Sequence, residues 1–409
     1  MNLNGYKMVD RFEQVDLFSA DEYRRRMDCI KAIMDKKSLD TVIFVECASV
    51  AYDQWLMGKR FLEYMVIPKN EAAIGVLWQE IDETGIDNQI GEVDFSRYTM
   101  QKPCTPPWDG VRFINRVTDK KIAELIAGST PTRIGLVSPE SISAELWDSL
   151  KAKLPRAEFE DITMDVDMVK CVKSREEIAA IEASASVQRR IVEALPQILR
   201  VGKSMRDVDR EVKAYLCSMG ASGFLHGGVM SNGKQDEPAR FTPTSDRKIC
   251  YGDRFFALME ANGPGHQHVA FGRHITLGEP TKGFAEAIEK GVKLNKFAAA
   301  QLKPGATLSE VVKRTTEYAH SIGNELKVCN WMHGLGGFFY ERYSLEDPSQ
   351  DIPLQENALV HCHPVTYRYF PELGPKVRED YFVLNTYLIT PEGGKDMSGI
   401  PLDLRTICC

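Results

Sequence analysis

The sequence lacks an excess of positive charge and a long hydrophobic run. Its 409 residues contain 51 Lys and Arg against 58 Asp and Glu, which gives a formal net charge of −7 at pH 7. Because binding to nucleic-acid phosphates needs basic patches, we expect no nucleic-acid partner. No window approaches the roughly 18 consecutive apolar residues of a membrane span, and the first residues contain no apolar core typical of a signal peptide. We therefore expect a cytoplasmic protein with no membrane partner.

Two common motifs are also missing. The ten cysteines have no CxxC spacing, which favours reduced thiols in a cytoplasmic protein. No glycine-rich phosphate fingerprint follows a predicted strand, so a nucleotide cofactor has little support. The adjacent Cys408 and Cys409 do not form a CaaX box, and their role stays open.

Histidine is absent from the first 225 residues, although the whole chain contains eight. Histidine is the side chain that most readily exchanges a proton or binds a metal near neutral pH. Its confinement to the second half predicts that an active site lies there. The eight are His226, His266, His268, His274, His320, His333, His361 and His363.

The predicted elements divide the chain into two domains, since its length exceeds what one compact core usually holds. Residues 1–158 alternate apolar strands with helical stretches, which is typical of an α/β domain. Residues 159–409 begin with a long helix, opened by Ser174 and Glu177 in capping-box spacing, and continue with strand-rich stretches. We expect this second part to be an α+β domain in which helices cover a curved antiparallel sheet.

A turn signal, NGPG at 262–265, separates two apolar strands and predicts a hairpin over residues 254–277. Counting by two places His268, Ala270 and Gly272 on one face of the return strand. Two small residues beside a histidine are consistent with a wall that faces a ligand. They are equally consistent with a glycine kink packed under another strand.

His361 and His363 are two residues apart and share one strand face, and Pro364 favours an end of the strand there. Beside Glu379 they could form a proton-transfer group or a metal pocket, or a structural pair in the core. His333 precedes several glycines, which allow backbone to approach a ligand closely. A buried core histidine is the alternative at that position.

Five motifs occur in order along the chain, and together they resemble the creatinase/aminopeptidase P family. They are KSREEIAAIEASA, GDRFFALMEANGPG with GRHITLGEP, KPGATLSEV, MHGLGG and a strand that ends in HP. The resemblance covers nearly the whole chain. It implies a creatinase-like N-terminal α/β domain over 1–158 and a pita-bread catalytic domain over 159–409. It also implies a homodimer in which the N-terminal domain borders the partner's active site.

The metallopeptidases of this family hold two divalent metals with two Asp, one His and two Glu. At the matching positions this chain has Leu258, Ala270, His333, His363 and Glu379, so only the His and the last Glu are retained. Because a hard dinuclear site needs several anionic oxygens, we expect no dinuclear centre and no metal cofactor. A single divalent metal stays open, with its ligands drawn from His333, His363, Glu379 and Glu260.

Creatinase is a metal-free member of the same fold that cleaves a C–N bond with a catalytic histidine, located in the loop before the Gly-Asp strand. The corresponding loop here contains His226, and its glycines predict a cover over the cavity. The spacing from His226 to Gly252 is longer than in the family pattern. Gly272 stands where creatinase has a glutamate.

We therefore predict a hydrolase that cleaves a C–N bond in a small molecule by acid–base catalysis with His and Glu side chains. A lyase using the same site, a metal-dependent Xaa-Pro-type peptidase and a non-catalytic binding protein are the alternatives. Arg60 is either a ligand for a substrate carboxylate, reaching the partner's cavity with Lys59–Phe61, or a surface residue. The predicted catalytic residues are His226, Glu260, His333, His363 and Glu379, and the predicted substrate-binding residues are His268, His361 and Arg60.

Overall fold

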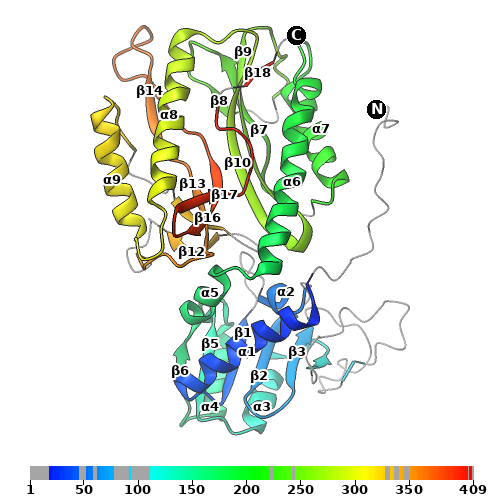
Figure 1. Cartoon of the computed structure of the whole chain (residues 1–409). Coiled ribbons are helices and arrows are strands. Elements are labelled where there is room, and N and C mark those ends of the chain that lie inside the picture. The colour runs from blue at the N-terminus through cyan, green and yellow to red at the C-terminus, as the bar shows by residue number, and fades with distance from the viewer. Residues whose placement is uncertain are drawn as a thin grey trace. The chain divides into compact units, whose positions relative to one another are not determined.

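The computed structural model divides the chain into two compact units between Lys170 and Cys171 (Figure 1). Each unit is described here by itself. The structure describes residues 18–45, 52–58, 62–77, 92–93, 111–221, 224–241, 245–327, 332–335, 340–344, 351–403 and 405–407.

The N-terminal unit is a six-stranded mixed sheet with strand order β4-β3-β2-β1-β5-β6. Central strand β1 is buried along its whole length, as expected for a strand covered on both faces. One face packs on α1, α2 and α5, and the other packs on α3 and α4. The elements are α1 (Ala20–Lys37), β1 (Thr41–Val45), α2 (Tyr52–Met57), β2 (Leu62–Pro68), β3 (Ala73–Leu77), β4 (Val111–Ile114), α3 (Asp119–Gly128), β5 (Arg133–Val137), α4 (Ala144–Lys153), β6 (Glu158–Asp161) and α5 (Thr163–Cys171).

The division between the units lies twelve residues beyond the boundary that we placed at 158 (170 − 158). Strand β6 begins at that point and pairs in parallel with β5, so it completes the sheet. Ile162 and Val166 then join the core of the same unit. Closing the sheet therefore requires a longer N-terminal unit than the change in sequence pattern suggested.

The C-terminal unit contains two five-stranded sheets, with orders β18-β10-β9-β7-β8 and β12-β11-β13-β16-β17, and the two-stranded sheet β14-β15. Helix α6 begins at the predicted capping box, in which Ser174 Oγ accepts from the Glu177 N–H at 3.1 Å. The elements are α6 (Arg175–Ile198), α7 (Met205–Ser218), β7 (Phe224–Lys234), β8 (Arg240–Phe241), β9 (Asp253–Asn262), β10 (His268–Leu277), α8 (Lys282–Gln301), α9 (Leu308–Ser321), β11 (Met332–Leu335), β12 (Tyr340–Ser344), β13 (Leu359–Cys362), β14 (Thr366–Tyr369), β15 (Arg378–Tyr381), β16 (Asn385–Thr390), β17 (Gly393–Asp396) and β18 (Arg405–Ile407).

The two large sheets are joined where β10 meets β16. The N–H of Gly272 donates to the carbonyl of Leu384 at 3.0 Å, and the N–H of Leu384 donates back at 3.2 Å. A Cβ atom at position 272 would lie 2.9 Å from Phe256 Cζ and 3.1 Å from Leu384 Cβ. Glycine therefore allows the close approach of the sheets, and the interpretation of a glycine packed under another strand is correct at this position.

Candidate functional site

The predicted hairpin forms, and it gives β9 and β10 one face toward the helices and one inner face. Met259, Phe271 and Ile275 pack in the core that also contains residues of α6 and α7. The alternate residues lie on the inner face because paired residues of antiparallel strands share a face. There Glu260 pairs with Ala270 and His268 pairs with Asn262. Glu260 and His268 are both buried, at 6% and 3% exposure.

His226 lies opposite Glu260 in the register of β7 and β9. The expectation of a loop at this position is therefore wrong, because the backbone of Phe224–Lys234 is a strand of the same sheet. The side chains of His226 and His333 lie outside the described part of the chain, as does Arg60 with its neighbours in Lys59–Phe61.

The other five-stranded sheet carries His333 and His361 on neighbouring strands. His333 on β11 lies opposite His361 on β13, and His361 in turn lies opposite Thr386 on β16. His361 is fully buried, His363 is half-buried, and their ring centroids lie 5.8 Å apart with the planes at 75°. The sequence-based expectation that these two side chains share a face agrees with this contact.

Thr386 links the two histidine-bearing sheets. Its Oγ1 accepts from the Ala270 N–H at 2.9 Å and donates to the Ala270 carbonyl at 3.1 Å. Two rows of paired strand residues therefore meet at this side-chain link, and together they comprise six positions, which we call the cross-sheet row. The row consists of His226, Glu260, Ala270, Thr386, His361 and His333.

The row sets the spacing of the ionisable groups. Glu260 and His226 are one strand step apart, as are His361 and His333. Glu260 and His361 are three steps apart, which is about 14 Å between backbones at about 4.8 Å for each step. This backbone separation is large enough for the side chains of Glu260 and His361 with a small molecule between them.

An apolar cluster lies directly beside the row. Its buried members are Phe256, Leu258, Ala270 and Leu384, and Met230 and Phe382 pack against them. Leu258 and Ala270 are the two positions at which the family resemblance implied aspartates. His363 is in ring contact with the same cluster, because its ring centroid lies 5.3 Å from that of Phe382.

Glu379 does not join the histidines. Its carboxylate forms an ion pair with Arg254 at 2.6 Å from Oε1 and 2.7 Å from Oε2, and it accepts from the Ala239 N–H. Arg254 lies six residues from Glu260 along β9, about 20 Å away. Strand β15 pairs with β14 and brings Glu379 to Arg254, at the opposite end of β9 from Glu260, so the structure does not group these two carboxylates as predicted.

The residues described contain no group of three or more His, Cys, Asp or Glu side chains placed to hold a metal ion. The single-metal set that the sequence left open required Glu379 and Glu260 together, and these two are separated. For His333, the third residue of that set, the structure gives the position in the strand and not the side chain.

A buried aromatic group around His274 was not found from the sequence. His274 stacks on Tyr381 with ring centroids 4.4 Å apart, contacts Phe256 at 4.7 Å, and donates from Nε2 to the Phe382 carbonyl at 2.9 Å. Burial, with the nearby positive charge of Arg254, lowers the pKa of His274 to about 3. Extending the period of two from Ala270 to position 274 would have placed it on the inner face.

This shift predicts a loss of stability in acid. The pKa of His274 is about 3 in the folded protein, against an ordinary value near 6.5 in the unfolded chain. Between these pH values only the unfolded chain binds the proton, so folding stability falls as pH drops below about 6.5, by up to about 1.4 kcal/mol for each pH unit. In urea unfolding between pH 4 and 6, His274→Gln is expected to show a shallower dependence on pH than the wild type. Equal slopes would contradict this assignment.

The fold and the inner face define a pita-bread protein of the creatinase/aminopeptidase P class. The sequence pattern of metallopeptidase family M24 matches residues 179–391, more than half of the chain, and the chain belongs to this family. Peptidases are hydrolases of C–N bonds, so the expected class of enzyme is confirmed at the level of the family.

Individual relatives agree with this assignment. The chain is 22% identical over 378 residues to a Xaa-Pro dipeptidase of Pyrococcus furiosus, covering 92% of this chain and 98% of the relative. Among solved structures it resembles the dipeptidase PepE of Mycobacterium ulcerans, with a TM-score of 0.73, 17% identity and coverage of 96% and 100%. It also resembles a Xaa-Pro dipeptidase from Bacillus anthracis, with a TM-score of 0.72, 17% identity and coverage of 94% and 99%. The predicted fold class is thereby confirmed.

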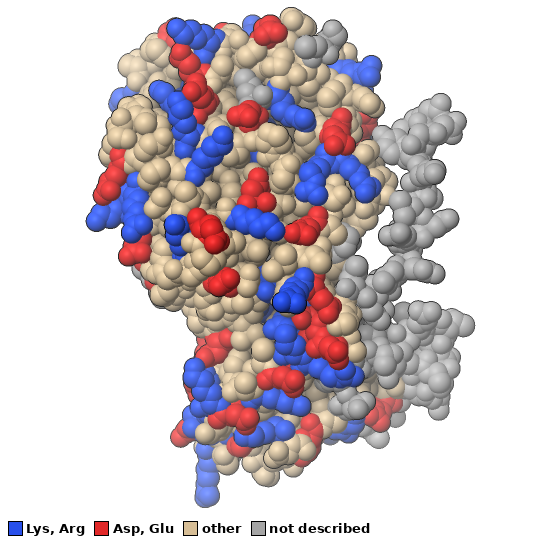
Figure 2. All heavy atoms as spheres, in the orientation of Figure 1, with Lys and Arg blue, Asp and Glu red and all other residues tan. Residues whose placement is uncertain are grey.

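Two of the expectations from composition can be compared with the structure. None of the helices in the described ranges is long and apolar enough to cross a membrane. On the face shown in Figure 2, basic and acidic side chains are interspersed, and neither sign forms a continuous patch.

Proposed function

We propose that this M24 protein hydrolyses a C–N bond in a small molecule by acid–base catalysis on the cross-sheet row, without a dinuclear metal centre. The observation that carries the proposal is the row itself, which places two ionisable pairs on either side of the joint between the sheets. One pair is Glu260 with the position of His226. The other is His361 with the position of His333.

The chemistry needs a base and an acid. Attack of water on an amide or amidine carbon requires a group that removes a proton from the water and a group that protonates the leaving nitrogen. A carboxylate and imidazoles in a site sheltered from water can serve both steps, because both kinds of side chain exchange protons in general acid–base catalysis. We assign the role of base to Glu260, with His226, and the role of acid to His333 and His363. We assign substrate positioning to His268 and His361.

The described residues do not fit a dinuclear site of the family type. Leu258 and Ala270 supply no oxygen atom, and both are packed into the apolar cluster. His363 replaces one carboxylate with a nitrogen donor, and Glu379 is neutralised by Arg254. Hard divalent metals in such centres rely on several carboxylate oxygens, so we derive no catalytic step through a metal.

The names of the relatives suggest a second candidate, a Xaa-Pro dipeptidase. The substrate of such an enzyme, a Xaa-Pro dipeptide, also contains an amide C–N bond. Because proline is the second residue, that amide is tertiary. The apolar cluster argues against the metal-dependent form of this activity. Xaa-Pro dipeptides therefore belong in the substrate panel beside ureas, amidines and N-alkyl amino acids.

The decisive experiment combines metal analysis with that panel. We expect purified protein to contain fewer than two metal equivalents per chain, and its turnover of a panel substrate to change less than twofold after treatment with a chelator. Turnover would be followed by release of the amine product, and metal by plasma mass spectrometry. Two tightly bound equivalents together with loss of turnover on chelation would contradict the proposal, and turnover of Xaa-Pro dipeptides alone would favour the second candidate.

We further propose that the protein is a cytoplasmic homodimer in which Arg60 contacts the partner's substrate, as the family resemblance implies. The interspersed charges seen in Figure 2 support the absence of a nucleic-acid partner. Light scattering at working concentration tests the assembly. A monomer that retains full activity would remove any role for Arg60 in the partner's site.

A further inference from the structure

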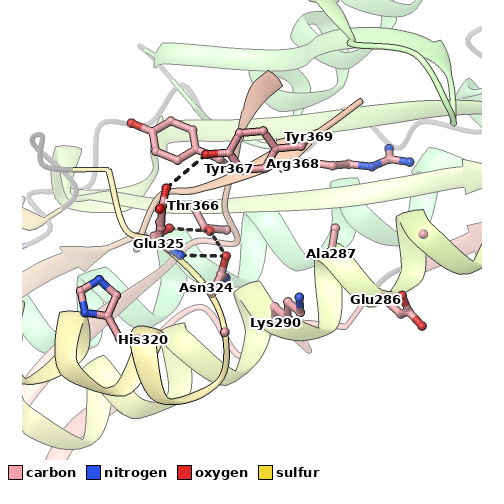
Figure 3. Close-up of a pocket in the computed structure, with 12 residues that line it drawn as sticks. Glu286, Ala287, Lys290, His320, Asn324, Glu325, Thr366, Tyr367, Arg368 and Tyr369 are labelled. Carbon is pink, nitrogen blue, oxygen red and sulfur yellow. Dashed lines mark hydrogen bonds between the residues drawn. The ribbon is translucent and has the colours of Figure 1, made fainter. Parts of the chain in front are cut away.

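A groove of about 550 Å³ lies between α8, α9 and β14, within the C-terminal unit (Figure 3). Its volume falls in the range of sites for small ligands. Lys290 contributes from α8, His320 from α9, and Tyr367 and Arg368 from β14. None of the residues in the cross-sheet row lines it.

Most charged groups at the groove already have a partner. Glu325 accepts from the Tyr369 hydroxyl at 3.1 Å, and Glu286 lies 3.9 Å from Lys282. Arg368 donates to the Gln235 carbonyl and lies 3.4 Å from Asp236. In Figure 3 the guanidinium of Arg368 points away from Lys290 and Asn324. Arg368 is therefore already engaged by other residues, and the two carboxylates at the groove each have a neighbouring donor or cation.

The polar groups that remain are donors. Within the described ranges, Lys290 and His320 form no ion pair or hydrogen bond, and Asn324 Nδ2 is buried with no acceptor. Asn324 Oδ1 is occupied, because it accepts from the Thr366 hydroxyl at 2.7 Å. An exposed ammonium group and an exposed imidazole that line one groove are suited to an anion.

We propose that this groove binds a small molecule that carries a single carboxylate and an apolar body. Lys290 binds the carboxylate, His320 supplies a further hydrogen-bonding group to the same groove, and Ala287 and Tyr367 contact the apolar body. Glu286 and Glu325 border the groove, so a dianion such as phosphate meets like-charge repulsion that a monoanion meets less strongly. This proposal is independent of the function proposed for the cross-sheet row.

The test uses benzoate, with inorganic phosphate as the dianion, and calorimetric titration of the whole protein. We expect saturable binding of benzoate, about tenfold weaker binding to Lys290→Gln, and weakened binding to His320→Gln, as for a lost hydrogen bond to a charged group. Lys293→Gln is the matched control, because Lys293 lies on the same helix, pairs with Glu289 at 2.7 Å and does not line the groove. Phosphate is expected to bind more weakly than benzoate.

A second measurement locates the site without relying on a variant. Benzoate should protect Lys290 from acetylation by an amine-reactive ester, as followed by mass spectrometry, and should leave Lys293 unprotected. Equal affinity of wild type and Lys290→Gln would place any benzoate elsewhere, including the inner face, and would overturn the proposal. Absence of benzoate binding, or phosphate binding as tightly as benzoate, would overturn it as well.

Discussion

Glu260→Gln is expected to lower kcat on the small-molecule substrate by on the order of 10²-fold or more, which is the usual effect of losing an acid–base group. The amide keeps the size of the side chain but cannot take a proton from water. Glu260 is the carboxylate of the cross-sheet row, and it lies opposite His226. Glu260 is buried, and β9 is paired on both sides, so the backbone around position 260 is held in place. We therefore expect the neutral amide to be accommodated there.

Stability must be measured beside rate to interpret this result. We expect the melting temperature of Glu260→Gln to stay within a few degrees of the wild type. The matched control is Glu279→Gln, at an exposed position two residues after β10, and it should change neither quantity. A Glu260→Gln protein that folds normally and retains its kcat would remove Glu260 from the catalytic step.

Histidine replacements test the proposed base and the proposed acid separately. His226→Ala and His363→Ala should each lower kcat by a similar factor of about 10². Combining His226→Ala with Glu260→Gln should cost less than the product of the single effects, since groups that act in one proton transfer are not additive. Additive losses would indicate that the two residues act in different steps.

The hairpin shows how far sequence reasoning extends. A turn signal and a period of two were sufficient to predict the hairpin and to place His268, Ala270 and Gly272 on one face of β10, because these contacts are local. The contact of Thr386 with Ala270 joins residues 116 positions apart, and no local pattern encodes it. The shared row of His226 and His361 therefore became visible only in the structure.

Glu379 shows the opposite outcome. Its match to a family motif depended on sequence order alone, and order does not reveal that β15 turns away to pair with β14. The cation that neutralises Glu379 is Arg254, which lies 125 residues earlier in a strand rich in apolar residues. No sequence pattern linked the two residues. A carboxylate that matches a family motif can therefore form an ion pair with a residue outside that motif.

The ion pair between Arg254 and Glu379 carries the largest expected effect on stability. Arg254 is 2% exposed, and the Glu379 side chain is 13% exposed. Arg254→Met removes the cation and leaves the carboxylate with the Ala239 N–H, so we expect the free energy of unfolding to fall by about 3–5 kcal/mol, the usual cost of removing one partner from a buried pair. Urea unfolding measures this as a lower midpoint.

Glu379→Gln is expected to destabilise less than Arg254→Met. The amide leaves no buried negative charge, and Arg254 keeps its bonds to the carbonyls of Glu237 at 2.7 Å and Lys234 at 3.2 Å. The matched control is Arg206→Met, which breaks an exposed pair with Asp246 and should leave the midpoint nearly unchanged. An Arg254→Met midpoint equal to that of the control would contradict the assignment of a buried pair.

The same variants decide between a structural and a catalytic role for Glu379. If the side chain only neutralises Arg254, Glu379→Gln should keep kcat within a few fold of the wild type at temperatures where it is folded. A catalytic carboxylate would instead lose about 10² in kcat with little change in the urea midpoint. We expect the first result, because Arg254 and the Ala239 N–H already hold the carboxylate.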